Sequence, residues 1–101
     1  MFKLDPNPTF WATVTVRVPG GTGQFDLQFK YLRLAERERY AKDLEGKSNL
    51  DALAELIADW RGIDADYNRD NLEQLLNEYP DAVRAITACY WGEVTGSIAK
   101  N

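Results

Sequence analysis

The chain has 101 residues, a formal net charge of −4 and 45% apolar residues, values typical of one small globular domain. The sequence has no apolar run of about eighteen residues and no apolar core near its start, so it predicts neither a membrane span nor a signal peptide. Cys89 is the one cysteine in the sequence. It therefore forms no intramolecular disulfide, which fits a reducing cytoplasm.

The acidic side chains gather in the second half of the sequence. Residues 1–31 carry three basic and two acidic side chains, and residues 32–47 carry five and four. Residues 48–101 carry four basic and ten acidic side chains. Nucleic acids and anionic membranes attract basic surfaces, so we expect neither as a partner. The distribution permits a basic protein partner.

The first part of the chain predicts an arm and a β-hairpin. Residues 1–9 contain two prolines and predict an extended arm. Residues 10–31 alternate apolar and polar side chains around the turn PGGTG, which predicts two antiparallel strands. The apolar face would carry Val14, Val16, Val18, Phe25, Leu27, Phe29 and Tyr31. A two-stranded ribbon is marginal in water, so this face must lie on helices or on another chain.

The turn PGGTG does not predict a phosphate-binding loop, although it is rich in glycine. Such a loop carries a lysine and leads into a helix whose N-terminus faces the phosphate. Here the glycines have no adjacent lysine and lead into a strand. We therefore interpret them as the tip of the hairpin.

The apolar period changes to that of helices in residues 32–101, which predicts a body of about four helices and an α+β fold in a single domain, 1–101. The first helix starts at Leu34 and stops at Gly46. Its sparse apolar contacts (Leu34, Tyr40, Leu44) indicate a solvated helix or one that packs on a partner. The second starts at Ser48 or Asn49 and ends at Gly62. Its apolar positions are Leu50, Leu53, Ala54, Ile57 and Trp60.

Proline and glycine bound the last two predicted helices. The third carries apolar residues at Leu72, Leu75, Leu76 and Tyr79 and ends before Pro80. Pro80 opens the fourth at its first turn, where a missing N–H costs little. The fourth ends at Gly96, and its apolar positions are Val83, Ile86, Tyr90 and Val94.

The residues before the third helix begin like a calcium loop. Asp64, Asp66 and Asn68 alternate as the first ligands of an EF-hand do. Counted from Asp64, position six is Arg69 and position twelve is Leu75, where that loop needs glycine and a bidentate glutamate. Capping of the next helix by Asn68 or Asp66 explains these oxygens. We therefore predict no metal site.

Few residues offer catalytic chemistry. The sequence has no histidine, which excludes a histidine general base and histidine-ligated zinc. Cys89 lies among Ala88, Tyr90 and Trp91 and is expected to be a small packing residue. A carboxylate pair acting on a sugar stays open, although nothing selects one. We expect no enzyme activity and no cofactor, with a small enzyme or ligand-binding domain as a further hypothesis.

Aromatic residues give a hypothesis of partner binding instead. The sequence holds more aromatic surface than one small core usually absorbs, and exposed aromatics often mark protein contacts. Adjacent strand residues face opposite ways, so Phe10 and Trp11 cannot both face the core. Trp60 is expected to close the core. The expected partner-binding residues are Phe10, Trp11, Phe29, Tyr31 and Trp91.

Four segments carry a family resemblance: FKLDPNPTF, the VPGG turn, FKYL, and NLEQLLNEYPDAVRAI before a tyrosine-containing last helix. With these, nearly the whole chain resembles the small tail assembly chaperones of long-tailed (siphovirus-type) bacteriophages and prophages. The segment RLAERERYAKDLEGKS has no matching feature. The resemblance implies a non-enzymatic protein that binds the tape-measure protein and helps to recruit tail-tube subunits. It also implies a place in the host bacterial cytoplasm and absence from the mature virion.

Many members of that family also have a longer form made by −1 frameshifting. Ala99-Lys100-Asn101 can be encoded GCA AAA AAC, which contains the slippery heptamer A AAA AAC. The resemblance therefore implies a possible longer form that departs at these residues. Two further expectations stay open. The protein is alternatively a structural tail or connector subunit retained in the virion, and its open hairpin edge permits a homo-oligomer.

Overall fold

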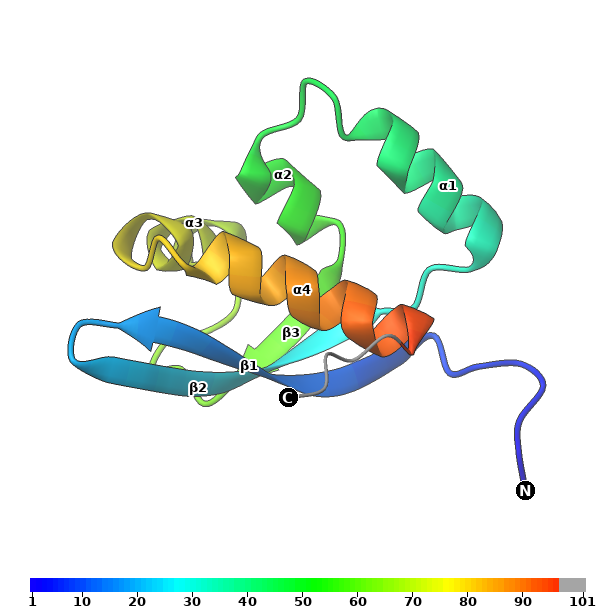
Figure 1. Cartoon of the computed structure of the whole chain (residues 1–101), viewed down its shortest axis with the longest axis horizontal. Coiled ribbons are helices and arrows are strands. Elements are labelled where there is room, and N and C mark those ends of the chain that lie inside the picture. The colour runs from blue at the N-terminus through cyan, green and yellow to red at the C-terminus, as the bar shows by residue number, and fades with distance from the viewer. Residues whose placement is uncertain (97–101) are drawn as a thin grey trace.

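A computed structural model describes residues 1–96 of the chain. The α+β class is confirmed, with an N-terminal antiparallel hairpin followed by four helices and one further strand (Figure 1). In chain order the elements are β1 (Thr9–Val18), β2 (Gly21–Lys30), α1 (Leu34–Asp43), α2 (Asn49–Ala54), β3 (Ile57–Arg61), α3 (Arg69–Glu78) and α4 (Ala82–Thr95).

The hairpin follows the alternation in the sequence. β1 pairs with β2 from Thr9 opposite Lys30 to Val18 opposite Gly21. The turn is shorter than PGGTG, because Pro19 and Gly20 alone connect the strands and β2 already starts at Gly21. Gly20 has a φ of +83°, which suits the second central position of a type II turn after proline. The buried side chains of the pair are Val14, Val16, Phe25, Leu27 and Phe29.

The predicted second helix is wrong in its second half. α2 ends at Ala54, and β3 pairs antiparallel with β2 to give a sheet of order β1-β2-β3. Ile57 and Trp60 are both buried, a spacing that suggested a helix. A bulge explains it: Trp60 lies opposite Leu27 and Ile57 opposite Phe29, so Ala58 is an extra residue. The extra residue turns two side chains three positions apart to the same face.

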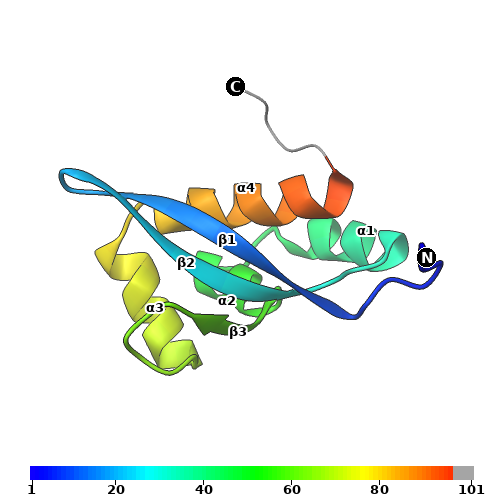
Figure 2. The ribbon, with the colours of Figure 1, turned by 90° about the horizontal axis from the view of Figure 1, so that it is seen from below.

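All four helices lie on one side of the sheet, as Figure 1 and the view from below in Figure 2 show. α4 lies along β1, and Tyr90 at its centre is fully buried. The Tyr90 hydroxyl donates to the Lys30 carbonyl at 2.9 Å and accepts from the Leu32 N–H at 3.2 Å. α4 is therefore held to the end of β2 by apolar burial and by hydrogen bonds. The predicted partner for the apolar face of the hairpin is this helix.

The predicted caps at Ser48, Asn68 and Gly96 are confirmed. Gly46 and Pro80 lie outside the helices that they were expected to bound, since α1 ends at Asp43 and α4 begins at Ala82. The Ser48 hydroxyl accepts from the Asp51 N–H at 3.0 Å, and the Asn68 side chain accepts from the Asn71 N–H at 2.8 Å. Gly96 ends α4 with a φ of +70°. Gly62 does not end a helix. It follows β3 with a φ of +84°, where a Cβ would contact the backbone of Phe25 at 3.6 Å.

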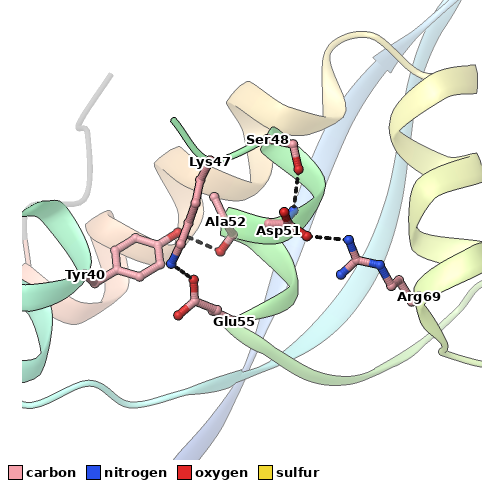
Figure 3. A network of polar contacts seen from close by, with 7 residues as sticks. All are labelled: Tyr40, Lys47, Ser48, Asp51, Ala52, Glu55 and Arg69. Atoms are coloured by element: carbon pink, nitrogen blue, oxygen red, sulfur yellow. Dashed lines mark hydrogen bonds and ion pairs between the residues drawn. The ribbon is translucent and has the colours of Figure 1, made fainter. Parts of the chain in front are cut away.

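α1 is the solvated helix that its composition predicts, since Tyr40 is its one buried residue. The Tyr40 hydroxyl donates to the Ala52 carbonyl of α2 at 2.7 Å (Figure 3). Lys47, in the loop between these helices, forms an ion pair with Glu55. Desolvation of the Tyr40 hydroxyl raises its pKa to about 12, so this donor keeps its proton at neutral pH.

Candidate partner-contact surface

Two of the five expected contact residues form part of the core. Phe29 is 0% exposed, so the expectation that it is exposed is wrong. Phe10 is half-buried and lies over it, with ring centroids 5.6 Å apart, and its ring also stacks on Tyr90 at 6.1 Å. The alternation of β1 turns Phe10 to the helices, which confirms that Phe10 and Trp11 face opposite ways. Phe10 therefore packs on the core and offers only part of its ring to a partner.

Trp11 stands on the open face of the sheet, 38% exposed. The Arg61 guanidinium of β3 lies 4.2 Å from the centroid of its ring, at cation–π distance. Asp26 of β2 holds that arginine at 3.0 Å and accepts from the Thr13 hydroxyl at 2.7 Å. These two donors, Thr13 first and then Arg61, lower the pKa of Asp26. Polar partners from three strands thus fix an exposed aromatic ring.

The N-terminal arm meets Trp11 at the open end of the hairpin. Figure 1 shows residues 1–8 running away from the sheet with no helix over them. Phe2 and Leu4 are 94% and 93% exposed. A hollow of about 300 Å³ joins the base of the arm to the sheet and to the end of α4. Its lining residues are Pro6, Asn7, Thr9, Phe10, Trp11, Tyr31, Glu93 and Val94.

Tyr31 is half-buried and meets Phe10 edge-on, with ring centroids 6.3 Å apart. The structure therefore brings together Phe10, Trp11 and Tyr31, which the sequence predicted, at the base of the arm, and the exposed Phe2 and Leu4 lie further along the arm. We call these five residues the arm surface.

Trp91 lies apart from the arm surface. It is half-buried on α4, where its ring meets Tyr90 at 5.1 Å and Tyr40 at 6.2 Å. Its outer edge lines a hollow of about 530 Å³ beside β1. Cys89 lines the same hollow, and its thiol donates to the Thr13 carbonyl at 3.6 Å. Burial raises the pKa of that thiol to about 11, which makes Cys89 a packing residue and a poor nucleophile at neutral pH.

The polar clusters of the described residues have structural roles. The Asp51 carboxylate pairs with Arg69, which ties α2 to the start of α3, and the Asp51 N–H donates to the Ser48 hydroxyl (Figure 3). Asp81 pairs with Arg84 and accepts from the Arg17 N–H of β1 at 3.0 Å. These contacts hold the pKa of the Asp81 carboxyl well below its usual range.

Residues 1–96 contain no group of three or more histidine, cysteine, aspartate or glutamate side chains placed to hold a metal ion. Within the same range, no helix is long and apolar enough to cross a membrane. The aspartates that begin like a calcium loop lie at the start of α3. Asn68 caps this helix, as predicted, and the Asp66 carbonyl accepts from the Asn71 side chain at 2.8 Å.

Two exposed apolar residues, Leu4 and Tyr79, carry no signal in the sequence that marks them as exposed. Leu4 follows a charged residue in the arm, and no periodicity marks it. Tyr79, 40% exposed, follows the last turn of α3, and we expected it on the apolar side of that helix. Leu34 is 64% exposed and Leu44 38%, as the sparse stripe of that helix suggested. A count of the apolar residues that the hairpin and α4 are too small to bury would have indicated that some apolar side chains must be exposed.

The fold and this surface define a small α+β protein. Its distinctive feature is a set of exposed aromatic and apolar side chains beside a three-stranded sheet that is covered by helices on one face. A family model described as phage tail assembly chaperone matches residues 1–101, the whole chain. The protein therefore belongs to the phage tail assembly chaperone family, which confirms the resemblance in its motifs. No curated protein and no solved structure matches the chain significantly.

Proposed function

We propose that the protein binds the tape-measure protein in the host bacterial cytoplasm, assists tail-tube assembly and leaves before the virion is complete. Its membership of the tail assembly chaperone family supports a role on phage tail proteins. The observation that carries the proposal is the arm surface, where Phe2 and Leu4 are more than nine-tenths exposed. A water-exposed apolar segment is stabilised by covering it with a partner.

The mechanism is reversible masking without catalysis. Apolar side chains of the tape-measure protein would lie on the arm and on Trp11, with Phe10 and Tyr31 beneath them and Trp91 as a separate contact. The Trp11 ring is already fixed by Arg61 and Asp26, so little side-chain entropy is lost when it is covered. Phe2 and Leu4 of the arm are almost fully exposed, so the arm can adapt to different segments of the partner.

Co-expression tests the proposal. The tagged protein is produced with the tape-measure and tail-tube proteins of the same phage and is then purified. We expect the tape-measure protein to co-purify, and the double variant Phe2→Ser/Leu4→Ser to lose most of it. Leu44→Ser is the matched control, because it also removes an exposed leucine but lies at the end of α1. Equal recovery with the arm variant would contradict the proposal.

A second experiment separates the chaperone from the alternative, a structural tail or connector subunit. Purified virions are analysed by gel electrophoresis and mass spectrometry. The proposal expects tube and tape-measure proteins with no trace of this chain. Its presence at a fixed ratio to the tube protein would establish the structural role.

Two further parts of the proposal need their own measurements. The frameshift residues Ala99-Lys100-Asn101 lie outside the described residues, and the gene sequence decides this point: codons without a slippery heptamer would rule it out. Self-association is tested by light scattering over a range of concentrations. A strict monomer at high concentration would exclude a homo-oligomer.

A further inference from the structure

A second surface, at the opposite end of the hairpin from the arm, has a different chemistry. α3 lies over the turn end of the hairpin in both Figure 1 and Figure 2. Between them are two hollows of about 470 and 350 Å³ that share Ile63, Asp64, Leu75 and Tyr79. We call this continuous depression the tip groove.

Apolar side chains line both sides of the tip groove, together with the polar side chains of Gln24, Asn71 and Gln74. Val18 and Phe25 line it from the hairpin, and Ile63 and Leu75 line it from the loop and helix opposite. Tyr79, at the end of α3, is 40% exposed, and its hydroxyl makes no hydrogen bond within residues 1–96. A groove with an aromatic wall and aliphatic neighbours suits one or two apolar side chains of a partner.

Its rim carries charge of one sign. Asp64 and Glu78 line the groove, and no lysine or arginine does. Neither carboxylate has an ion-pair partner among the described residues. The two cations of the same region are already engaged, Arg61 with Asp26 and Arg69 with Asp51.

The hollow beside Trp91 does not carry charge of one sign. Its lining includes Glu93 and also Arg84, which pairs with Asp81, so side chains of both signs lie at its edge. Charge complementarity fixes which partner binds more than it fixes affinity. The tip groove combines apolar side chains with two carboxylates, Asp64 and Glu78, that have no ion-pair partner among the described residues, whereas the hollow at the base of the arm has one such carboxylate, Glu93.

We propose that the tip groove docks a segment of a partner protein in which apolar side chains are flanked by lysine or arginine. The apolar side chains enter between Val18, Leu75 and Tyr79, and the flanking cations pair with Asp64 and Glu78. The inference rests on the proposed function only in taking the occupant to be a protein. The arm surface and the tip groove would then bind two different segments, or two different tail proteins, at once.

Defined peptides test the docking. The probe is an amphipathic peptide made of leucine and lysine. One control peptide replaces lysine with glutamate, and another replaces leucine with serine. Affinity is measured by fluorescence anisotropy, and the site is mapped by amide NMR shifts. We expect the leucine–lysine peptide to bind, to shift residues around Ile63, Leu75 and Tyr79, and to bind more weakly as salt screens the rim.

Matched variants separate the groove from net charge. Asp64→Asn/Glu78→Gln removes two carboxylates at the rim, and Glu38→Gln/Asp43→Asn removes two exposed carboxylates of α1. We expect the rim variant to lose at least about tenfold in affinity and the α1 variant to bind as the wild type does. Tyr79→Ser should weaken binding by a similar factor, with thermal unfolding showing that each variant folds.

Several outcomes would overturn the inference. These are undetectable binding, equal loss in both charge variants, equal binding of the glutamate peptide, or NMR shifts centred on Trp11. A dimer that dissociates in Tyr79→Ser would assign the groove to a second copy of the chain. If the peptide fails while the tape-measure protein still co-purifies, the inference fails and the proposed function stands. If the peptide binds normally while the tape-measure protein no longer co-purifies, the proposed function fails and the inference stands.

Discussion

α4 and α1 are attached to the same small fold in different ways. α4 buries Ala82, Ala85, Ile86 and Tyr90, and the Tyr90 hydroxyl bonds two backbone groups, one at the end of β2 and one just beyond it. α1 buries Tyr40 alone and leaves Leu34 64% exposed. Since burial of apolar area supplies most of the folding free energy, α4 and the hairpin hold the fold together. We expect α1 to open at a lower free energy.

The largest test of this difference is Tyr90→Ala. Loss of a fully buried aromatic ring should lower the free energy of unfolding by about 3–5 kcal/mol, measured by chemical denaturation. Tyr90→Phe keeps the ring and removes the hydroxyl, which leaves the Lys30 carbonyl and the Leu32 N–H without their partner. We expect it to cost about 1–3 kcal/mol. A smaller loss in Tyr90→Ala than in Tyr90→Phe would contradict the role of the ring.

Tyr40→Phe should cost less, about 1–1.5 kcal/mol, because one hydrogen bond to Ala52 is lost. Hydrogen exchange measures where the loss falls. Amides of α1 should exchange faster while those of α4 keep their protection. Tyr31→Phe is the control, since the Tyr31 hydroxyl has no hydrogen-bond partner among residues 1–96. Faster exchange across both helices would show that α1 and α4 open together.

Ser48→Ala sharpens the comparison at α2, which connects the two regions. Removal of the hydroxyl that caps this six-residue helix should cost about 0.5–1 kcal/mol in thermal or chemical unfolding. Ser48→Asp retains an acceptor and should restore most of the loss. Unchanged stability in Ser48→Ala would mean that contacts of Leu53 hold α2 in place without the cap.

The smallest effect is expected at Trp11. Trp11→Ala removes an exposed ring and its cation–π contact with Arg61, which should change the free energy of unfolding by only about 0.5 kcal/mol. Trp11→Phe keeps a ring there and should be closer still to the wild type. A loss as large as that of Tyr90→Ala would show that Trp11 serves stability, and its assignment to a contact surface would then be unsupported.

Local rules predicted most of the fold. The alternation of β1 and β2 identified the hairpin and its buried face, and short polar side chains identified the caps at Ser48 and Asn68. β3 was missed for a physical reason. Its bulge at Ala58 places Ile57 and Trp60 on one face, and a helix gives the same spacing. Only the free edge of β2 distinguishes the two, and that edge is a tertiary feature.

The contact surface was less predictable than the fold. Alternation showed that Phe10 and Trp11 cannot both face the core, but it could not show that Arg61 would lie on the Trp11 ring, because β3 was not expected. Phe29 was expected both on the apolar face of the hairpin and as a contact residue, and the helices that cover this face bury it completely. Tyr79 and Glu78 became the wall and rim of a groove only once α3 was placed over the hairpin turn.

The Cys89 thiol has a practical consequence. The sequence contains one cysteine, so a thiol reagent labels a single position. The thiolate is the reacting form, and the raised pKa leaves little of it while the thiol lies against the Thr13 carbonyl. Labelling at neutral pH is therefore expected to be slow while α4 lies on β1 and faster when α4 moves away. A change in the labelling rate between variants would report on how firmly the last helix packs on the sheet.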